Sequence, residues 1–145
     1  MTVSQPGPSE ADGSPLQVFP LVRHLSARLT PLLMRSPFSA NQITSASLIV
    51  GLAACGAVLP GTWSGTVIGG VLLVICYILD NCDGEIARLK NQSSEFGMYF
   101  DTFVDWLVHS AFFAALGQGV TVTTGESVWG WLGWAAAAGG TLNYA

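Results

Sequence analysis

Four aspartates stand at set spacings in the middle of the chain, and each pair lies at the end of a long apolar run. Asp80 and Asp83 belong to the segment DNCDGEIAR, and Asp101 and Asp105 to the segment GMYFDTFVD. Placing a carboxylate deep in a membrane helix costs about 2.5–3.5 kcal/mol, so such residues mark a functional site. The stretch that contains these aspartates is therefore the candidate site.

Both pairs have helical spacing. Asp80 and Asp83 are three residues apart, roughly 60° around a helix, while Asp101 and Asp105 are four apart. A short loop joins the two expected helices, so we expect them to be antiparallel neighbours whose aspartates converge at one mouth of a bundle. Between residues 80 and 105 there are six acids and two bases. Four carboxylates brought together cannot all stay ionised without a cation.

Two divalent cations would balance these charges. Ligands that are all oxygen atoms suit Mg²⁺ or Mn²⁺ rather than zinc or copper. Two such ions roughly 3.5–4 Å apart are the usual clamp for displacement at phosphorus. Arg88 has the guanidinium fork that binds a phosphate through two hydrogen bonds. Asp105 has a carboxylate that can ligate a metal and also take the proton of an attacking hydroxyl group.

Several neighbouring residues also have an ordinary structural interpretation. Gly84 and Gly97 leave room for a ligand, but Gly97 is equally well a loop glycine. Asn41 and Thr44 can equally cap and pack the first apolar helix. His109 extends the face of Asp101 and Asp105, and we expect it to be a packed or hydrogen-bonded residue rather than a metal ligand.

Composition indicates a membrane protein. Half of the 145 residues are hydrophobic and 10% are charged, compared with roughly 25% charged in soluble domains. No basic patch suggests nucleic acid as a partner. The three cysteines are odd in number and lack C-x-x-C spacing, so neither a disulfide framework nor a zinc site is expected.

The first 36 residues precede the apolar spans. Residues 1–15 are rich in Ser, Pro, Gly and acidic residues, lack a secretory signal, and predict a disordered tail. Residues 16–36 predict a juxtamembrane amphipathic helix that lies on the membrane surface, with Pro20 in its first turn and Pro31 ending or kinking it near its far end. Its apolar stripe consists of Val18, Val22, Leu25, Leu29 and Leu32.

Residues 37–145 contain four apolar runs and predict an all-α integral membrane bundle. Ser39 and Gln42 have capping-box spacing, so the first span should begin near Ala40. In this span a stripe of small residues every four positions would let a neighbouring helix approach closely; it consists of Ser47, Gly51 and Cys55. The expected apolar runs are 40–59, 63–79, 96–120 and 128–145, with a polar loop at 121–127. The helix of the second run is expected to continue past the membrane to about Lys90.

All five basic residues fall on one side of this topology. The positive-inside rule then places the amphipathic helix and the aspartates toward the cytoplasm. The five are Arg23, Arg28, Arg35, Arg88 and Lys90.

The aspartate segment resembles the signature of the CDP-alcohol phosphotransferase (CDP-alcohol phosphatidyltransferase) family of membrane enzymes. That signature is D-x-x-D-G-x-x-A-R, about eight residues, then G-x-x-x-D-x-x-x-D. The first span also opens with Asn41-Gln-Ile-Thr44 as in the family, although Ala40 stands where a proline is frequent. The chain matches every fixed position of the signature: Asp80, Asp83, Gly84, Ala87, Arg88, Gly97, Asp101 and Asp105.

The resemblance implies a bundle of six transmembrane helices, often a homodimer, with its site facing the cytoplasm from the cytoplasmic membrane. About four of those helices are expected within residues 37–145, so the chain resembles a truncated family domain. Two Mg²⁺ or Mn²⁺ ions would be held by Asp80, Asp83, Asp101 and Asp105. Asp105 would be the general base. The CDP-linked donor would be bound by Asn41, Thr44, Asp80, Gly84, Ala87, Arg88 and Gly97.

The activity implied is transfer of a phosphatidyl-type, substituted phosphate group from a CDP-linked donor such as CDP-diacylglycerol to an alcohol, with release of CMP, in phospholipid biosynthesis. The segment 83–90 and His109 look similar to members that act on inositol phosphates; glycerol phosphate is the other acceptor considered. Two alternatives remain. One is an ion or proton transporter using the aspartates, which the confinement of the acids to one mouth disfavours; the other is an inactive fragment that acts as a dimerisation partner.

Overall fold

The computed structural model describes residues 20–141, and the side chains from residue 25 onward. The predicted tail at 1–15 and the first four residues of the predicted amphipathic helix lie outside the described residues. The described part of the chain consists of helices and the loops that join them, without strands, which confirms the predicted all-α fold class. Its helices are α1 (Pro20–Met34), α2 (Ala40–Val58), α3 (Trp63–Leu89), α4 (Glu95–Thr124) and α5 (Val128–Thr141).

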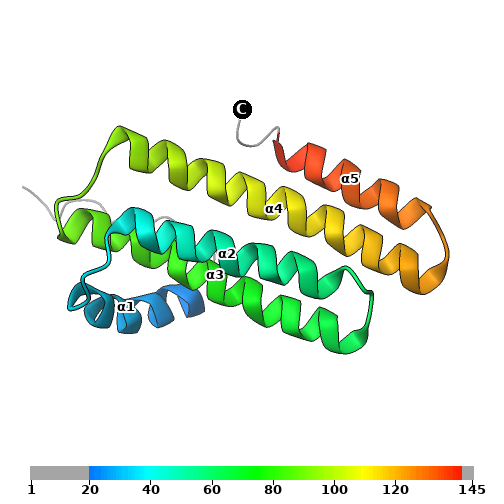
Figure 1. Ribbon diagram of the computed structural model, residues 1–145, viewed down its shortest axis with the longest axis horizontal. Helices are drawn as coiled ribbons and strands as arrows, with labels where there is room; N and C mark the ends of the chain where they lie inside the picture. Colours follow the sequence, from blue (N-terminus) through cyan, green and yellow to red (C-terminus); the bar gives the residue numbers. More distant parts are fainter. Residues whose placement is uncertain (1–19, 142–145) are drawn as a thin grey trace, which may run out of the picture.

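Helix α2 is the centre of the bundle, because it packs against both α3 and α4. Figure 1 shows α2 and α3 as an antiparallel hairpin with α4 running alongside. The short α1 lies against the end of α3 where the chain turns toward α4, and α5 folds back along the far end of α4. The turn between α3 and α4 therefore lies at the same end as α1.

Two helices, α2 and α3, are long and apolar enough to cross a membrane by length and composition. Helix α3 has 27 residues and begins at the exposed Trp63. The prediction that α4 and α5 are also membrane spans stays a prediction, as does the orientation of the bundle.

The capping box predicted at the start of α2 is present. The Ser39 hydroxyl accepts from the Gln42 amide, and the Gln42 side chain accepts from the Ser39 amide in return. By contrast, the predicted loop at 121–127 begins too early, because α4 continues to Thr124 and ends at Gly125 with φ +76°. Threonine hydroxyl groups in this last turn donate to carbonyl groups four residues earlier, so these polar residues stay within the helix.

The small-residue stripe on α2 does permit close packing, as predicted. Ser47, Gly51 and Cys55 are all buried. A Cβ atom added to Gly51 would lie 2.6 Å from Cγ2 of Val108 on α4 and 3.2 Å from Sγ of Cys76 on α3. Glycine at this position therefore lets three helices meet.

Helix α1 is attached to α3 through a polar face. Among the α1 side chains from residue 25 onward, Ser26 and Thr30 are buried, and the Thr30 hydroxyl donates to Oε2 of Glu85 at 2.6 Å. Lys90 donates to the carbonyl oxygens of the α1–α2 linker, at 3.0 Å to Ser36 and 2.8 Å to Phe38. Pro31 lies inside the helix, which ends three residues later at Met34. The exposed Leu25 and Leu32 remain free to face a membrane surface, which stays a prediction.

Helices α4 and α5 cross at two glycines. A Cβ on Gly133 would lie 2.7 Å from the Phe113 carbonyl oxygen and 2.9 Å from Cα of Gly117. A Cβ on Gly117 would in turn meet the Trp129 carbonyl at 2.6 Å. These contacts are with backbone atoms, so they cannot be relieved by a side-chain rotation.

We predict that Gly133→Ala lowers the free energy of unfolding by about 1–3 kcal/mol, because the new methyl group forces α5 away from α4. Gly139→Ala is the matched control on the same helix, since nothing lies within 4 Å of its added Cβ. Helix propensity alone favours alanine by about 1 kcal/mol, so the control should be neutral or stabilising. Thermal unfolding in detergent measures both variants. If the two variants change the unfolding temperature equally, the close crossing of α4 and α5 at Gly133 is contradicted.

Candidate functional site

Three of the four predicted aspartates come together between α3 and α4. One carboxylate oxygen from each of Asp80, Asp83 and Asp101 lies within 4.8 Å of the other two, and Asp83 is 3% exposed. The helical spacing of Asp80 and Asp83 puts both on the side of α3 that faces the first turns of α4. We call these three residues the aspartate trio.

The aspartate trio fits a divalent cation. No lysine or arginine in the described part of the chain forms an ion pair with it, so its like charges lack a protein counter-charge. Oδ1 of Asp101 is buried and has no hydrogen-bond partner among the described residues. An acceptor left in this state is unfavourable unless something binds it. Three carboxylates, one of which has an unpaired oxygen, are ligands of the kind that Mg²⁺ and Mn²⁺ prefer.

Thr44 is the partner of the most buried member of the trio. Its hydroxyl donates to Oδ2 of Asp83 at 2.6 Å, across the α2–α3 interface. Thr44 is itself 3% exposed. The sequence predicted Thr44 as part of the donor-binding set; the structure shows in addition that it orients an aspartate.

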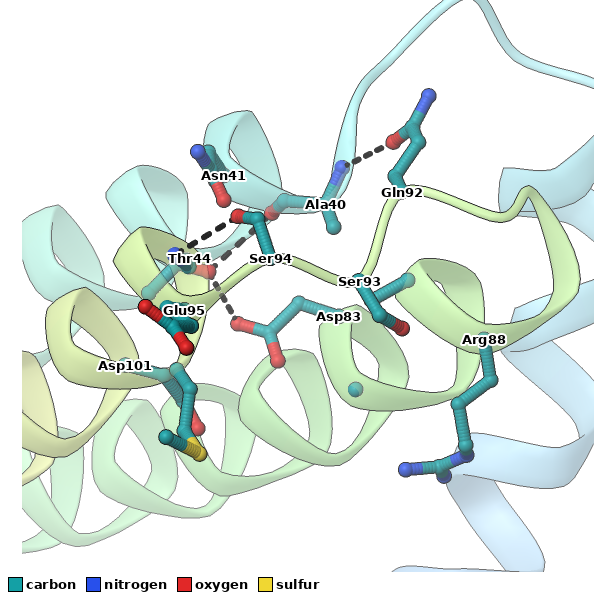
Figure 2. Close-up of a pocket in the computed structure, with 14 residues that line it drawn as sticks. Ala40, Asn41, Thr44, Asp83, Arg88, Gln92, Ser93, Ser94, Glu95 and Asp101 are labelled. Carbon is teal, nitrogen blue, oxygen red and sulfur yellow. Dashed lines mark hydrogen bonds between the residues drawn. The ribbon is translucent and has the colours of Figure 1, made fainter.

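A cavity of about 490 Å³ opens beside the aspartate trio. Figure 2 shows that its walls come from the start of α2, the end of α3 and the loop and first turns leading into α4. Asp83 and Asp101 both reach it, and Asp80 is the one residue of the predicted donor-binding set that is not in its lining. The other six line it: Asn41, Thr44, Gly84, Ala87, Arg88 and Gly97.

The two glycines of the signature have different surroundings. A Cβ on Gly84 would meet only the Nη1 atom of Arg88, at 3.6 Å, so this side of α3 is open toward the cavity. A Cβ on Gly97 would lie 3.1 Å from Oγ of Ser94 and 3.2 Å from Oδ1 of Asn41. Gly97 therefore lets the start of α4 approach α2. Its role is close packing between two helices, not only the backbone flexibility expected of a glycine in a loop.

The loop that closes the cavity was not among the predicted site residues. Gln92 accepts a hydrogen bond from the Ala40 amide at 3.0 Å and so ties the loop to the start of α2. Ser94 caps α4 by accepting from the Gly97 amide at 3.0 Å. A serine three residues before that glycine was a usable capping signal in the sequence, whereas the contact of Gln92 with Ala40 had no local signal.

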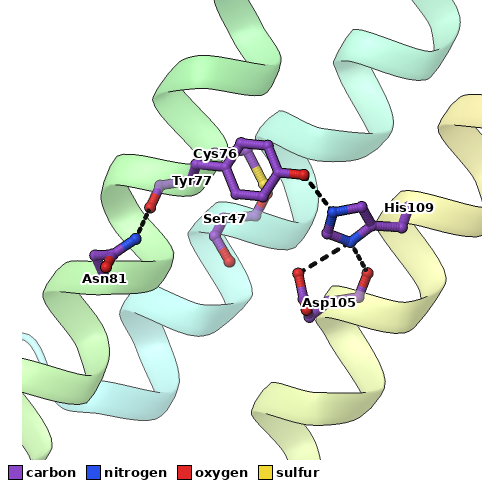
Figure 3. Close-up of polar contacts among 6 residues, drawn as sticks. All are labelled: Ser47, Cys76, Tyr77, Asn81, Asp105 and His109. Atoms are coloured by element: carbon purple, nitrogen blue, oxygen red, sulfur yellow. Dashed lines mark hydrogen bonds and ion pairs between the residues drawn. The ribbon is translucent and has the colours of Figure 1, made fainter. Parts of the chain in front are cut away.

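Asp105 is placed apart from the aspartate trio. Its Oδ1 atom lies 3.0 Å from Nδ1 of His109, one helical turn further along α4. The second ring nitrogen of His109 is hydrogen-bonded to the Tyr77 hydroxyl on α3, as Figure 3 shows. His109 is thus hydrogen-bonded, in agreement with expectation, while the metal and base roles of Asp105 remain predictions.

Comparisons with known proteins identify the family of the chain. The family model for CDP-alcohol phosphatidyltransferase matches residues 38–140. The chain is 30% identical over 118 residues to the bifunctional IPC transferase and DIPP synthase of Aquifex aeolicus, which covers 81% of this chain and 25% of that relative. A relative of the same description from Thermococcus kodakarensis is 30% identical over 109 residues, covering 75% of this chain and 23% of the relative.

The chain belongs to the CDP-alcohol phosphatidyltransferase family. Family membership and the two apolar helices together indicate a membrane protein. The chain spans about a quarter of the length of the curated relatives that it matches.

We predict that Thr44→Val weakens Mn²⁺ binding by about 10–100-fold, because Asp83 loses the donor that orients it beside the trio. The matched control is Thr66→Val on α3, whose exposed hydroxyl donates only to the carbonyl of Thr62. Titration of Mn²⁺ followed by electron paramagnetic resonance measures both affinities. If Thr44→Val and Thr66→Val bind Mn²⁺ equally well, Thr44 does not support a metal site.

Proposed function

We propose that this protein transfers a substituted phosphate group from a CDP-linked donor to the hydroxyl group of an alcohol, with release of CMP. The observation that carries the proposal is the aspartate trio beside a cavity lined by the signature residues. A volume of about 490 Å³ lies within the range of roughly 300–1,000 Å³ that is usual for small-molecule sites. The relatives are named as transferases and synthases, which supports a transferase here.

The donor is proposed to bind with its diphosphate between Arg88 and the aspartate trio. The side of α3 at Gly84 is open, so a phosphate can approach the backbone and reach the Arg88 guanidinium. Asn41, Ala87 and Gly97 complete the walls around the nucleotide. CDP-diacylglycerol is the proposed donor, inositol phosphate or glycerol phosphate the proposed acceptor, and phospholipid synthesis the proposed role.

Two divalent cations, Mg²⁺ or Mn²⁺, held by the trio and Asp105, would supply positive charge against the phosphate oxygens. Asp105 accepts the proton of the acceptor hydroxyl. The acceptor oxygen forms a new bond to the phosphorus that carries the substituent, and the bond from that phosphorus to the CMP oxygen breaks. The leaving CMP carries away the electron pair of the broken bond, so atoms and charge balance.

The proposed location is the cytoplasmic membrane, with the site facing the cytoplasm. The basic residues at the α1 end and Lys90 at the end of α3 support this orientation under the positive-inside rule. A homodimer is the proposed assembly, as the family resemblance implies.

We predict that Asp80→Asn or Asp101→Asn abolishes CMP release from CDP-diacylglycerol in proteoliposomes supplied with Mg²⁺ or Mn²⁺, because each substitution removes a charged ligand of the trio. Glu126→Gln, an exposed acid beyond the end of α4, is the control that should retain activity. Chelation of the metal should stop release, and re-addition should restore it. The readout is labelled CMP, measured with a panel of acceptor alcohols. No release from the unsubstituted protein with any acceptor would contradict the proposal.

We predict that Asp105→Asn lowers kcat for CMP release by about 10²–10⁴-fold, the usual contribution of a general base. The amide has nearly the size of the carboxylate but cannot accept the acceptor's proton. Steady-state rates at saturating donor and acceptor measure the effect. An Asp105→Asn variant with unaltered kcat would assign the base to another group.

A further inference from the structure

A second polar cluster lies next to the aspartate trio and joins α3 to α4. It consists of Tyr77 on α3 with Asp105 and His109 on α4, and Figure 3 shows the His109 ring between the other two side chains. The side chains of His109 and Asp105 are 27% and 30% exposed. Because Tyr77 stands one turn before Asp80 and Asp105 one turn after Asp101, the cluster borders the trio on both helices.

The geometry fixes where the hydrogens lie in this cluster. Nδ1 of His109 is 3.0 Å from Oδ1 of Asp105 and 2.7 Å from the Asp105 carbonyl oxygen. Both neighbours are acceptors, so Nδ1 carries the hydrogen and donates to them. Nε2 of the neutral ring is then an acceptor, and the Tyr77 hydroxyl donates to it. With His109 neutral, the hydrogen bonds run in one direction, from Tyr77 through His109 to the Asp105 carboxylate.

Tyr77 is itself held in place. Its ring contacts the His109 ring with centroids 5.3 Å apart and planes tilted by 55°. Its carbonyl oxygen accepts from the Asn81 side chain at 2.8 Å. The residue before it, Cys76, is buried and donates to the Ser47 carbonyl on α2 at 3.2 Å. The donor at the head of the chain of hydrogen bonds thus stands on a part of α3 that is fixed against α2.

We propose that Tyr77 and His109 are positioning residues that hold the Asp105 carboxylate in a fixed orientation for proton transfer from the acceptor alcohol. This inference rests on the proposed function, in which Asp105 is the base. An aspartate without such a partner rotates about χ1 and χ2, and a misplaced reacting group lowers the rate steeply. The contact with His109 fixes one oxygen of the Asp105 carboxylate, and its other oxygen would bind a cation or accept the acceptor's proton.

The kinetic test uses two substitutions of equal size at position 109. Asn places an amide N–H near the position of Nδ1 and keeps a donor to Asp105, whereas Leu has the same shape and no donor. We expect His109→Leu to lower kcat at least tenfold with the KM for the CDP-linked donor unchanged. His109→Asn should retain most of the activity. Equal kcat values in the two variants would overturn the proposal.

Tyr77→Phe provides a second measurement should both substitutions at position 109 prevent folding. It removes a single oxygen atom and keeps the ring, and we expect kcat to fall by about tenfold at unchanged KM. Tyr99→Phe is the matched control: it removes the same hydroxyl group from an exposed tyrosine on α4, and its rates should be unchanged. A Tyr77→Phe variant as fast as the Tyr99→Phe control would also overturn the proposal.

Nitrogen-15 NMR of labelled histidine tests the same arrangement without turnover, so it separates this inference from the proposed function. A His24→Gln background leaves His109 as the single imidazole of the chain. We expect the Nδ1–H tautomer. The Nδ1 resonance should shift in Asp105→Asn, and the Nε2 resonance should shift in Tyr77→Phe. An Nε2–H tautomer, or resonances that neither substitution moves, would refute the positioning role even in an active protein. If no acceptor supports CMP release but the NMR signature is present, the proposed function fails while the geometry stands.

Discussion

Mutual repulsion among carboxylates is the constraint on which the rest of the structure depends. Asp80, Asp83 and Asp101 stand within a few ångströms of one another on two different helices, with one oxygen left unpaired. Like charges at this distance are tolerated where the helices are held together by other means, where a proton is shared, or where a cation joins them. The protein holds these helices together in three ways: by the close packing of α2, by the polar attachment of α1 and by the hydrogen bond from Thr44 to Asp83.

Much of the fold was readable from the sequence because its signals are local. The capping box at Ser39, the small-residue stripe through Gly51 and the helical spacing of the aspartates each act within one or two turns of one helix. The cap and the close packing at Gly51 followed as predicted, and three of the four aspartates came together. The end of α4 was misplaced because threonines near position 124 satisfy their hydroxyl groups on their own helix, which composition alone does not reveal.

The candidate site was predictable only as far as its signature extends. Residues such as Gly84 and Arg88 were identified from fixed spacings and do line the cavity. Three long-range contacts had no such signal: Gln92 with Ala40, Thr44 with Asp83, and Tyr77 with His109. Each joins residues more than 30 positions apart, so its existence depends on the register of packed helices, which no local pattern encodes.

The length of α3 has a further consequence. Its 27 residues extend for about 40 Å, while the apolar core of a bilayer is about 30 Å thick. With Trp63 at one interface, the opposite boundary between hydrocarbon and water falls close to the aspartates. The proposed lipid-linked donor could then keep its acyl chains dissolved in the bilayer while its diphosphate stays hydrated. Reaction at this boundary would require neither the transfer of charge into hydrocarbon nor the extraction of the lipid into water.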